Sequence, residues 1–391
     1  MSQAVVSVNA GILLPVLAPA VGAAVVLVTD VAVQHLRRAH YLIALASLLV
    51  GAVATFAGLG RVGGDARQTL CLPGGGQCMY SVDSVGSTLQ LAAMLAAIVT
   101  LLLSWPDDKH EARGRTAVVV SLVLTATAGA AAVAGARDLG SWLVALELAT
   151  LPTVALVALR GVRSAISGAV ALLTTALVSF GLLSLSAALW FTATGSGFLT
   201  PAAAMTVVGD PAKRSILVLA VVVVIAGVGF KLSLVPFHAW TPEAYDGAPL
   251  PIAAFLSGVS KIAALAALLA VVRAVAPLGA PPLAAIAIVA AVSMTLGNIM
   301  ALRQSGVIRL LAWSTVAQAG WVVLPLAAVS SAAVHASGVY LLAYVVATLL
   351  AFAVVAALVQ IRGSARARDL ADYRGLLSDH PVLASALALA L

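Results

Sequence analysis

Residues 227–261 read GVGFKLSLVPFHAWTPEAYDGAPLPIAAFLSGVSK, and the rest of the chain is organised around this stretch. It places Lys231 deep in a long apolar run, and Pro236 follows five residues later. Proline lacks a backbone N–H and its ring clashes with the carbonyl of Leu232, so a helix must break or kink beside the charge. A polar turn follows, and a second apolar run carries Lys261 near its middle. Because an ionisable group at bilayer depth costs roughly 2.5–3.5 kcal/mol, two of them beside a broken helix predict a transport site.

The composition is that of a membrane protein. Of the 391 residues, 62% are hydrophobic and 9% are charged, whereas a soluble domain carries about 25% charged residues. Apolar runs of about 20 residues recur along the chain, which predicts an all-α, polytopic bundle of transmembrane helices. The net charge is +7, and it lies mainly in short loops between apolar runs. We therefore expect these charges to set membrane topology and not to bind nucleic acid.

The apolar runs predict eleven spans and three units. The spans lie near 10–29, 40–59, 84–103, 116–135, 139–159, 166–192, 215–235, 250–275, 279–301, 306–328 and 333–359, and a twelfth apolar run begins at Pro381. We expect three N-terminal helices in residues 1–115, a five-helix unit with the broken helix in 116–275, and the start of a second such unit in 276–391. A unit with an odd number of helices returns inverted when it is repeated directly. This predicts an antiporter-like fold of inverted repeats whose second repeat is incomplete in this chain.

The basic residues predict the orientation. Loops after odd-numbered spans contain more than half of them: Arg37, Arg38, Lys109, Arg113, Arg115, Arg160, Arg163, Arg303, Arg309, Arg362, Arg366, Arg368 and Arg374. The opposite side contains Arg61, Arg67, Arg137, Lys213, Arg214 and Arg273. By the positive-inside bias, the N-terminus lies outside and the 360–380 loop is cytoplasmic. The excess of arginine over lysine and of alanine suggests a GC-rich bacterial genome, so we expect a multi-pass protein of the bacterial inner membrane.

Three residues within predicted spans are the candidate proton carriers. Glu147 is the only carboxylate inside a predicted span, and we expect it to carry a proton or to tune a lysine as its counter-ion. The alternative is a glutamate that faces a wet groove or pairs structurally. The chain has four lysines and 17 arginines, yet both cations that lie more than three residues from the end of a predicted span, Lys231 and Lys261, are lysines. A desolvated lysine can release its proton near neutral pH, whereas arginine effectively never does. We therefore expect both lysines to titrate; the alternative is that they snorkel and only tune packing.

Weaker candidates for lining a hydrated path are four side chains near these spans: His238, Gln318, His335 and Tyr340. Each has a structural alternative, such as a helix–helix hydrogen bond for Gln318 and a plain interfacial role for His238. Glu243 and Asp246 are most simply solvated carboxylates on the cytoplasmic side, with proton uptake as the alternative.

The two cysteines and the glycines suggest no redox cofactor site. Cys71 and Cys78, in CLPGGGQC, are separated by six residues of which three are glycine, and they fall on the expected oxidising face. We predict a disulfide, with two free loop thiols as the alternative. Two cysteines cannot hold an iron–sulfur cluster, and no His or Cys group has metal-ligand spacing. Residues 58–63 match GxGxxG but follow a membrane helix and not a strand, so we reject a dinucleotide site.

Phe230–Ala263 resembles the signature of subunit N of the proton-pumping NADH–quinone oxidoreductase, respiratory complex I. DLGSWLVALELATLP at 138–152, RLLAWSTVAQAG at 309–320 and DLADYRGL at 369–376 are similar to the same family in the same order. The resemblance implies an antiporter-like subunit of the membrane arm, in which quinone reduction elsewhere drives proton translocation. It implies no cofactor in this chain, since NADH, quinone, flavin and iron–sulfur clusters are used by other subunits. The implied partners are other membrane-arm subunits, the lipid bilayer and protons.

Carried over to this chain, the resemblance makes Glu147 the channel glutamate, Lys231 the broken-helix lysine and Lys261 the central lysine. It also exposes two departures. The family usually has a further lysine in its sixth span, but 166–192 contains none. The second broken helix, with its exit-side lysine, would lie beyond Leu391.

Two alternatives stay open. The first is a subunit of a multisubunit cation/proton antiporter, although the residues around Pro236 favour complex I. The second is a structural membrane-arm subunit that does not pump, suggested by the missing sixth-span lysine.

Overall fold

The computed structural model describes residues 6–33, 37–60, 66–73, 77–105, 115–279, 284–328, 330–363 and 367–391. Four of the basic residues used to predict the orientation, Arg61, Lys109, Arg113 and Arg366, lie outside the described residues.

Ten of the described helices are long and apolar enough to cross a membrane. They are α1 (Ala10–Ala32), α2 (Arg37–Thr55), α3 (Ser84–Leu103), α4 (Arg115–Gly135), α5 (Leu139–Ala158), α6 (Arg163–Thr194), α8 (Pro211–Leu232), the consecutive pair α10 (Leu250–Ser257) and α11 (Val259–Val275), α13 (Val307–Val323) and α14 (Ser331–Arg362). Two apolar helices are shorter, α12 (Ala284–Ala301) and α16 (Pro381–Ala390). The expected span 279–301 corresponds to α12, and 280–283 lie outside the described residues.

Shorter elements connect these helices. They are the strands β1 (Arg67–Cys71) and β2 (Cys78–Val82), the helices α7 (Pro201–Met205), α9 (Trp240–Gly247) and α15 (Leu376–Asp379), and 3₁₀ turns at Phe56–Gly58, Ala276–Leu278, Leu324–Ala328 and Leu370–Tyr373. β1 and β2 pair antiparallel, with Arg67 opposite Val82, and the Cys71–Cys78 disulfide closes the hairpin at its other end.

Polar side chains mark where several spans begin. The caps whose side chains accept a hydrogen bond from the first turn are Asn9 before α1, Asp83 before α3, Asp138 before α5, Asp210 before α8 and Ser330 before α14. Each satisfies backbone N–H groups that have no partner inside the helix. The apolar runs therefore start at defined residues, and the spans keep a fixed register relative to the loops.

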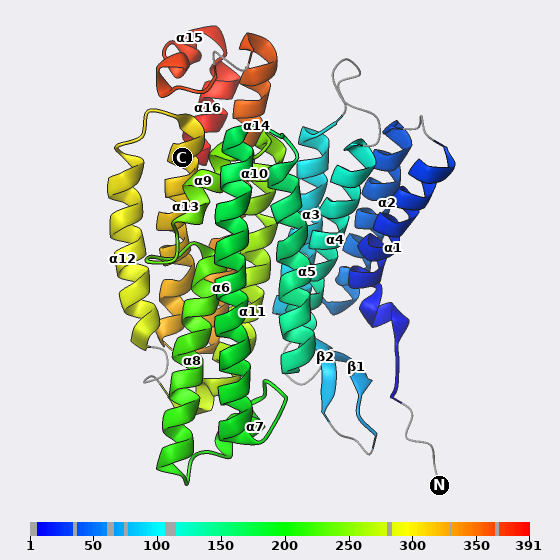
Figure 1. Ribbon diagram of the computed structural model, residues 1–391, viewed down its shortest axis with the longest axis vertical. Helices are drawn as coiled ribbons and strands as arrows, with labels where there is room; N and C mark the ends of the chain where they lie inside the picture. Colours follow the sequence, from blue (N-terminus) through cyan, green and yellow to red (C-terminus); the bar gives the residue numbers. More distant parts are fainter. Residues whose placement is uncertain are drawn as a thin grey trace.

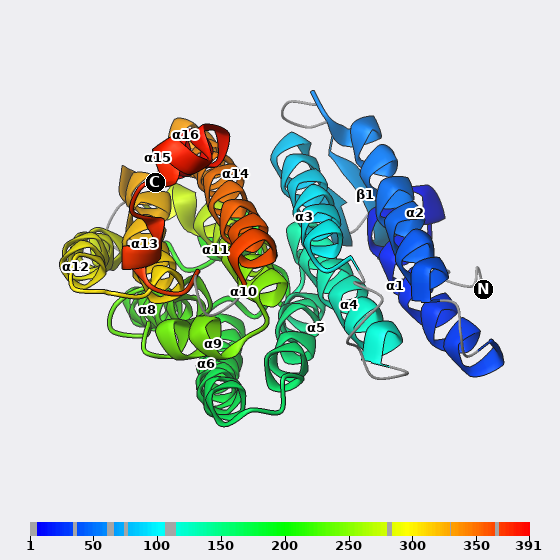
Figure 2. The ribbon, with the colours of Figure 1, turned by 90° about the horizontal axis from the view of Figure 1, so that it is seen from above.

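The spans form two groups with α11 between them. Figure 2 shows α1 to α4 side by side on one flank, with α6, α8, α9, α12, α13 and α14 gathered on the other. α11 is almost wholly buried, and it contacts α3, α4 and α5 as well as α8. The Trp142 indole N–H donates to the carbonyl of Ala267 over 3.2 Å, which ties α5 to α11. This arrangement brings α5, α8 and α11 together in the interior.

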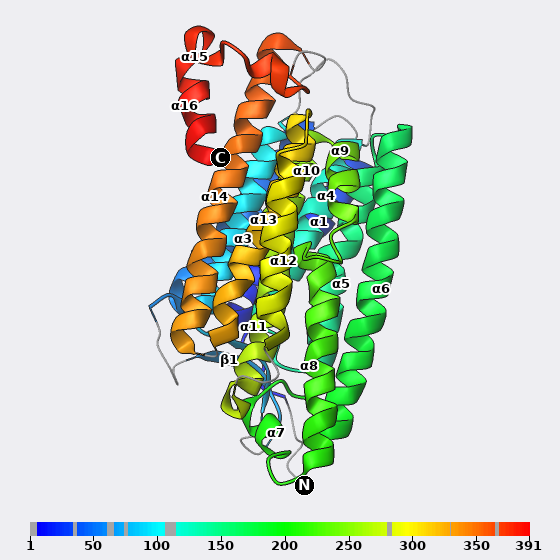
Figure 3. The same ribbon diagram turned by 90° about the vertical axis from the view of Figure 1, so that its left-hand side faces the viewer.

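The two ends of the bundle differ in their elements and in their charge. The hairpin and α7 lie at one end, and α15 and the start of α16 lie at the other (Figures 1 and 3). The helix ends at the α15 end carry the described basic residues that were expected on the cytoplasmic side, such as Arg37, Arg115 and Arg163. Arg67 in the hairpin and Lys213 at the start of α8 lie at the opposite end. The expected division of charge is therefore a feature of the fold.

The eighth α-helix breaks beside its lysine, as the sequence predicts, but three residues earlier than the expected span end at 235. It ends at Leu232, Ser233 adopts a left-handed conformation with φ 68°, and α9 starts only at Trp240. A neighbouring helix, α12, contacts the segment between α8 and α9. The backbone N–H of Val235 in this segment donates to Ser293 Oγ of α12 over 2.9 Å. A second break, at Gly258, separates α10 from α11 and was not expected within the span 250–275.

Close backbone contacts hold the far half of the broken helix. A Cβ on Gly168 of α6 would lie 2.6 Å from the carbonyl oxygen of Glu243, and one on Gly247 would lie 2.5 Å from that of Ser164. Only glycine permits such an approach, so α9 packs closely on α6 at its middle and at its C-terminal end.

Candidate functional site

The first component of the site is Glu147, near the middle of α5. Asp138 caps the start of α5, and Pro152 lies inside it, so the carbonyl of Leu148 lacks the usual N–H partner four residues on. The Glu147 side chain is 15% exposed. It is thus a largely buried carboxylate beside a weakened turn of a membrane helix.

Lys231 lies in the last turn of α8 and faces α5. Its Nζ donates to Glu147 Oε1 over 2.9 Å and to Thr150 Oγ1 over 2.8 Å, and its side chain is 7% exposed. Thr150 Oγ1 itself donates to the carbonyl of Leu146 over 2.7 Å, so it has a lone pair free to accept from the lysine. The ion pair that sequence alone could not establish therefore bridges α5 and α8.

Lys261, in the first turn of α11, contacts the broken end of α8. Its Nζ donates to the backbone carbonyl of Lys231 over 3.0 Å and to Ser233 Oγ over 2.5 Å, and it lies 4.8 Å from the ring centroid of Trp240. Among the described residues, no carboxylate lies within ion-pairing distance of Lys261. Lys231 is therefore bound to Glu147 through its side chain and to Lys261 through its backbone.

Side chains use two of the carbonyls in the last turn of α8. The carbonyl of Phe230 accepts from Trp240 Nε1 over 2.7 Å, and the carbonyl of Lys231 accepts from Lys261 Nζ. The reason is that α8 ends in a left-handed turn, where the N–H of Leu234 returns to the carbonyl of Gly229. The last-turn carbonyls then point at α9 and α11.

Ser233 joins the two halves of the break. A left-handed conformation is uncommon for residues other than glycine and costs roughly 1–2 kcal/mol. Here the Ser233 hydroxyl accepts from Lys261 Nζ and from Thr241 Oγ1, the latter over 2.6 Å. Such strain typically persists where the surroundings impose it, often at functional sites.

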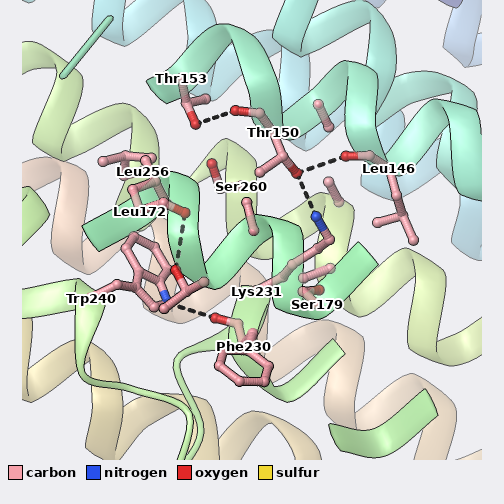
Figure 4. Close-up of a pocket in the computed structure, with 15 residues that line it drawn as sticks. Leu146, Thr150, Thr153, Leu172, Ser179, Phe230, Lys231, Trp240, Leu256 and Ser260 are labelled. Carbon is pink, nitrogen blue, oxygen red and sulfur yellow. Dashed lines mark hydrogen bonds between the residues drawn. The ribbon is translucent and has the colours of Figure 1, made fainter. Parts of the chain in front are cut away.

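A small cavity of about 30 Å³ lies beside Lys231 (Figure 4). Hydroxyl groups from α5, α6 and α11 line it, among them Thr150, Thr175 and Ser260. Ser260 Oγ is buried and has no hydrogen-bond partner among the described residues. The lining is mainly apolar with a few hydroxyl groups, and the space is about the size that one water molecule needs. Lys231 therefore faces a small space that a water molecule can fill.

Comparison with known proteins identifies the family of this chain. A family profile described as "NADH:quinone oxidoreductase/Mrp antiporter, TM" matches residues 136–391. Over 399 aligned residues the chain is 39% identical to NADH-quinone oxidoreductase subunit N of Salinispora tropica, covering 97% of this chain and 74% of that protein. The chain belongs to the subunit N family of NADH-quinone oxidoreductase. The resemblance inferred from the sequence motifs is confirmed.

Another relative and two solved structures are consistent with this assignment. Subunit 14 of the Thermus thermophilus NADH-quinone oxidoreductase is 37% identical over 319 residues, which cover 80% of this chain and 65% of that protein. A chain in a structure of respiratory complex I from Thermus thermophilus with bound aureothin has a TM-score of 0.77 at 30% identity, covering 96% of this chain and 77% of that one. A chain of the Mrp complex from Dietzia sp. has a TM-score of 0.79 at 20% identity, covering 97% and 70%, and therefore shows a shared fold only.

The sixth span, in which we expected a lysine from the resemblance to the subunit N family, lines the cavity beside Lys231. This span is α6, which contains no lysine and lines the cavity with Leu172, Thr175, Ala176 and Ser179. The Ser179 hydroxyl donates to the carbonyl of Gly227 over 2.7 Å. The part of α6 that lines this cavity therefore supplies two hydroxyl groups and no charged side chain.

The four weaker candidates do not join the Glu147–Lys231–Lys261 group. Tyr340 donates to Gln318 Oε1 over 2.6 Å in a separate contact between α13 and α14. His238 packs on the ring of Trp313 with centroids 5.1 Å apart, and its buried Nδ1 has no partner. His335 is exposed, with Nδ1 2.8 Å from the carbonyl of Ser331 in its own helix.

The two carboxylates of α9 lie at the surface. Arg309 Nη1 is 3.7 Å from Glu243 Oε1 and 4.0 Å from Asp246 Oδ2, and all three side chains are about half exposed. Exposed pairs of this kind contribute little to stability. This geometry agrees with solvated carboxylates, the simpler interpretation of the sequence.

Proposed function

We propose that this chain is a proton-translocating membrane-arm subunit of NADH:quinone oxidoreductase, and that Glu147, Lys231 and Lys261 carry the proton. The observation that supports the proposal is that Lys231 contacts the other two residues at once. Its Nζ is 2.9 Å from Glu147 Oε1, and its carbonyl is 3.0 Å from Lys261 Nζ. Quinone reduction elsewhere in the complex would supply the driving force.

The break in α8 supplies the means of coupling. Lys231 is one residue from the end of a helix that does not continue until Trp240, so its last turn is less constrained than a helix interior. A small rotation of that turn alters two contacts together, the ion pair to Glu147 and the hydrogen bond from Lys261. Intramembrane ionisable groups at broken helices are the usual coupling sites of transporters.

The cavity supplies the route for the proton. With the Glu147–Lys231 pair closed, the proton is held on Lys231 Nζ by Glu147 and Thr150. With the pair open, water in the adjacent cavity takes the place of the carboxylate, and Nζ can pass its proton on. Lysine permits this release, whereas arginine would not.

We also propose that redox chemistry lies elsewhere in the complex. Electrons would pass from NADH through flavin and iron–sulfur clusters in other subunits to quinone, and this chain would bind none of these groups. Among the described residues, no cluster of three or more His, Cys, Asp or Glu side chains could hold a metal ion. Lipid and the neighbouring membrane-arm subunits would cover the outer faces of the bundle.

For topology we propose a bacterial inner-membrane protein with its N-terminus outside. The end bearing α15, where most of the described basic residues lie, would then be cytoplasmic. Residues 116–275 would form the first five-helix unit, and 276–391 the start of its inverted partner. A reporter fused within 367–380 should show cytoplasmic activity, and periplasmic activity there would reverse the assignment.

The experiment is proton transport in vesicles that contain the assembled complex with a variant of this subunit. We expect Lys231→Ala and Lys261→Ala to abolish most NADH-driven proton transport without loss of assembly. Lys213→Ala, at an exposed lysine 54% accessible at the start of α8, is the matched control and should pump normally. Normal pumping by both buried-lysine variants would favour a structural subunit.

A second arm separates pumping from cation/proton antiport, the alternative that the shared fold with an Mrp subunit favours. Proton transport by the wild-type complex should be the same with sodium and with choline as the bulk cation. A strict requirement for sodium would support antiport.

A further inference from the structure

A second cavity opens at the hairpin end of the molecule, remote from the lysines. It has a volume of about 530 Å³. Its walls are the hairpin, the α4–α5 turn, the segment before α7 and the end of α11, and its charged lining groups are Asp83, Arg137 and Arg273. None of these residues takes part in the proposed proton path.

The charges in this cavity do not balance. Arg273 Nη1 is paired with Asp83 Oδ2 at 3.0 Å, which leaves Arg137 without a carboxylate within ion-pairing distance among the described residues. Among the described residues, the Arg137 side chain makes one hydrogen bond, from Nη1 to the carbonyl of Ala136 over 3.0 Å. Burial, and next the nearby Arg273 guanidinium, lower the pKa of Arg137, and the Asp83 carboxylate partly offsets this by raising it. The Arg137 side chain is half-buried at the cavity wall, and most of its five N–H donors have no partner among the described residues.

The backbone around Arg137 is fixed on both sides. Its N–H donates to the carbonyl of Met79 in β2 over 2.9 Å, and its carbonyl accepts from the N–H of Leu199 over 2.8 Å. Tyr80 of the hairpin packs on Gly135, where a Cβ would lie 2.3 Å from the ring. The guanidinium is therefore presented from a rigid junction of three segments, which is what a preformed binding site requires.

The cavity also has an apolar side. Leu199, Pro201, Ala270 and Ala274 line it together with the arginines. Guanidinium groups bind phosphate oxygens through paired N–H donors, which a single point charge cannot do. An anion with an apolar portion would satisfy both parts of the lining.

We propose that this cavity binds a phosphate group, with Arg137 as the principal ligand and Arg273 as the second. The phosphate would replace the missing counter-ion and use the free donors of Arg137. Two sources share this chemistry, the phosphodiester headgroup of an anionic phospholipid and a free phosphate ion. The cavity lies at an end of the bundle, where either source has access.

The test uses the full chain, purified in detergent and stripped of lipid, with bound ligand counted by native mass spectrometry. The probes are dioleoylphosphatidylglycerol, inorganic phosphate, and dioleoylglycerol, which has the same acyl chains and no phosphate. We expect wild-type protein to bind phosphatidylglycerol or phosphate at one site and dioleoylglycerol not at all. Arg137→Gln should raise the dissociation constant about tenfold or more, as expected for loss of a charge-assisted hydrogen bond.

The matched control is Arg214→Gln, which makes the same charge change at an exposed position on the same end of the bundle. It should bind like the wild type. If inorganic phosphate displaces the lipid, the site recognises the phosphate group alone. If the lipid binds and phosphate does not displace it, the site recognises the lipid headgroup. Equal binding by Arg137→Gln and wild type, or binding of dioleoylglycerol as tight as that of the phospholipid, overturns the proposal.

Two further measurements keep the test decisive if Arg137→Gln does not fold. Arg137→Lys keeps the charge but not the paired donors, and it should bind less tightly than wild type. Binding to wild-type protein should also weaken as salt is raised to about 1 M, because the interaction is between charges. A dissociation constant that does not change with salt concentration would contradict a phosphate site.

Discussion

The Glu147–Lys231 pair offers a test of both stability and function in one double-mutant cycle. Removing one partner of a buried ion pair costs about 3–5 kcal/mol, because it leaves the other charge uncompensated. Glu147→Gln keeps an acceptor 2.9 Å from Nζ, and Thr150 stays at 2.8 Å. A hydrogen bond to a charged group contributes about 1.5–3 kcal/mol, so the expected net loss is about 2 kcal/mol. Lys231→Met leaves the Glu147 carboxylate buried without a cation, so the expected loss of stability is larger.

The double variant Glu147→Gln/Lys231→Met removes both charges and should be more stable than the sum of the single changes by about 2 kcal/mol. The free energy of unfolding is measured by detergent titration of the purified chain in mixed micelles. Proton transport is measured in vesicles with the assembled complex, where all three variants should lose most of their pumping. Additive stabilities would refute the pairing, and full pumping by Glu147→Gln would reduce Glu147 to a structural residue.

Two other predictions concern packing and the hairpin. Gly129→Ala should destabilise the bundle by about 1–3 kcal/mol and lower pumping, because its Cβ would lie 2.4 Å from the backbone nitrogen of Ala149 on α5, which carries the carboxylate. Gly181→Ala, with nothing within 4 Å, is its control and should leave both unchanged. Cys71 and Cys78 should resist thiol labelling in native membranes until a reductant is added; labelling without reductant would show that the disulfide is absent.

The positions of the spans follow from apolar runs and caps. α3, α4 and α5 each begin and end within one residue of the prediction, because Asp83 and Asp138 mark two of the starts and the apolar runs are uninterrupted. The breaks are harder to predict. Pro236 shows that a helix must break near it, but the end at Leu232 depends on the left-handed turn that follows. Gly258 gives a weak signal, since one glycine in a helix costs only about 1 kcal/mol.

The sequence predicts which residues belong to the candidate site, but it does not predict which of them contact one another. Depth in an apolar run identifies Glu147, Lys231 and Lys261, because ionisable groups there are rarely incidental. The pairing of Glu147 with Lys231 joins residues 84 positions apart and depends on how α5 packs against α8. Thr150 could have been found from its spacing of three residues from Glu147, which places both on one helix face. Ser233 gave no such signal, because its role arises from the turn.

The central claim is that Lys231 releases its proton during turnover, and one variant tests it most directly. Lys231→Arg keeps a positive charge beside Glu147 and Thr150, but arginine effectively cannot deprotonate. The measurement is NADH-driven proton transport in vesicles, with assembly of the complex checked first and Lys231→Ala measured alongside. We expect Lys231→Arg to fail nearly as completely as Lys231→Ala. Near-normal pumping by Lys231→Arg would show that a fixed positive charge is enough, and would contradict proton transfer through this lysine.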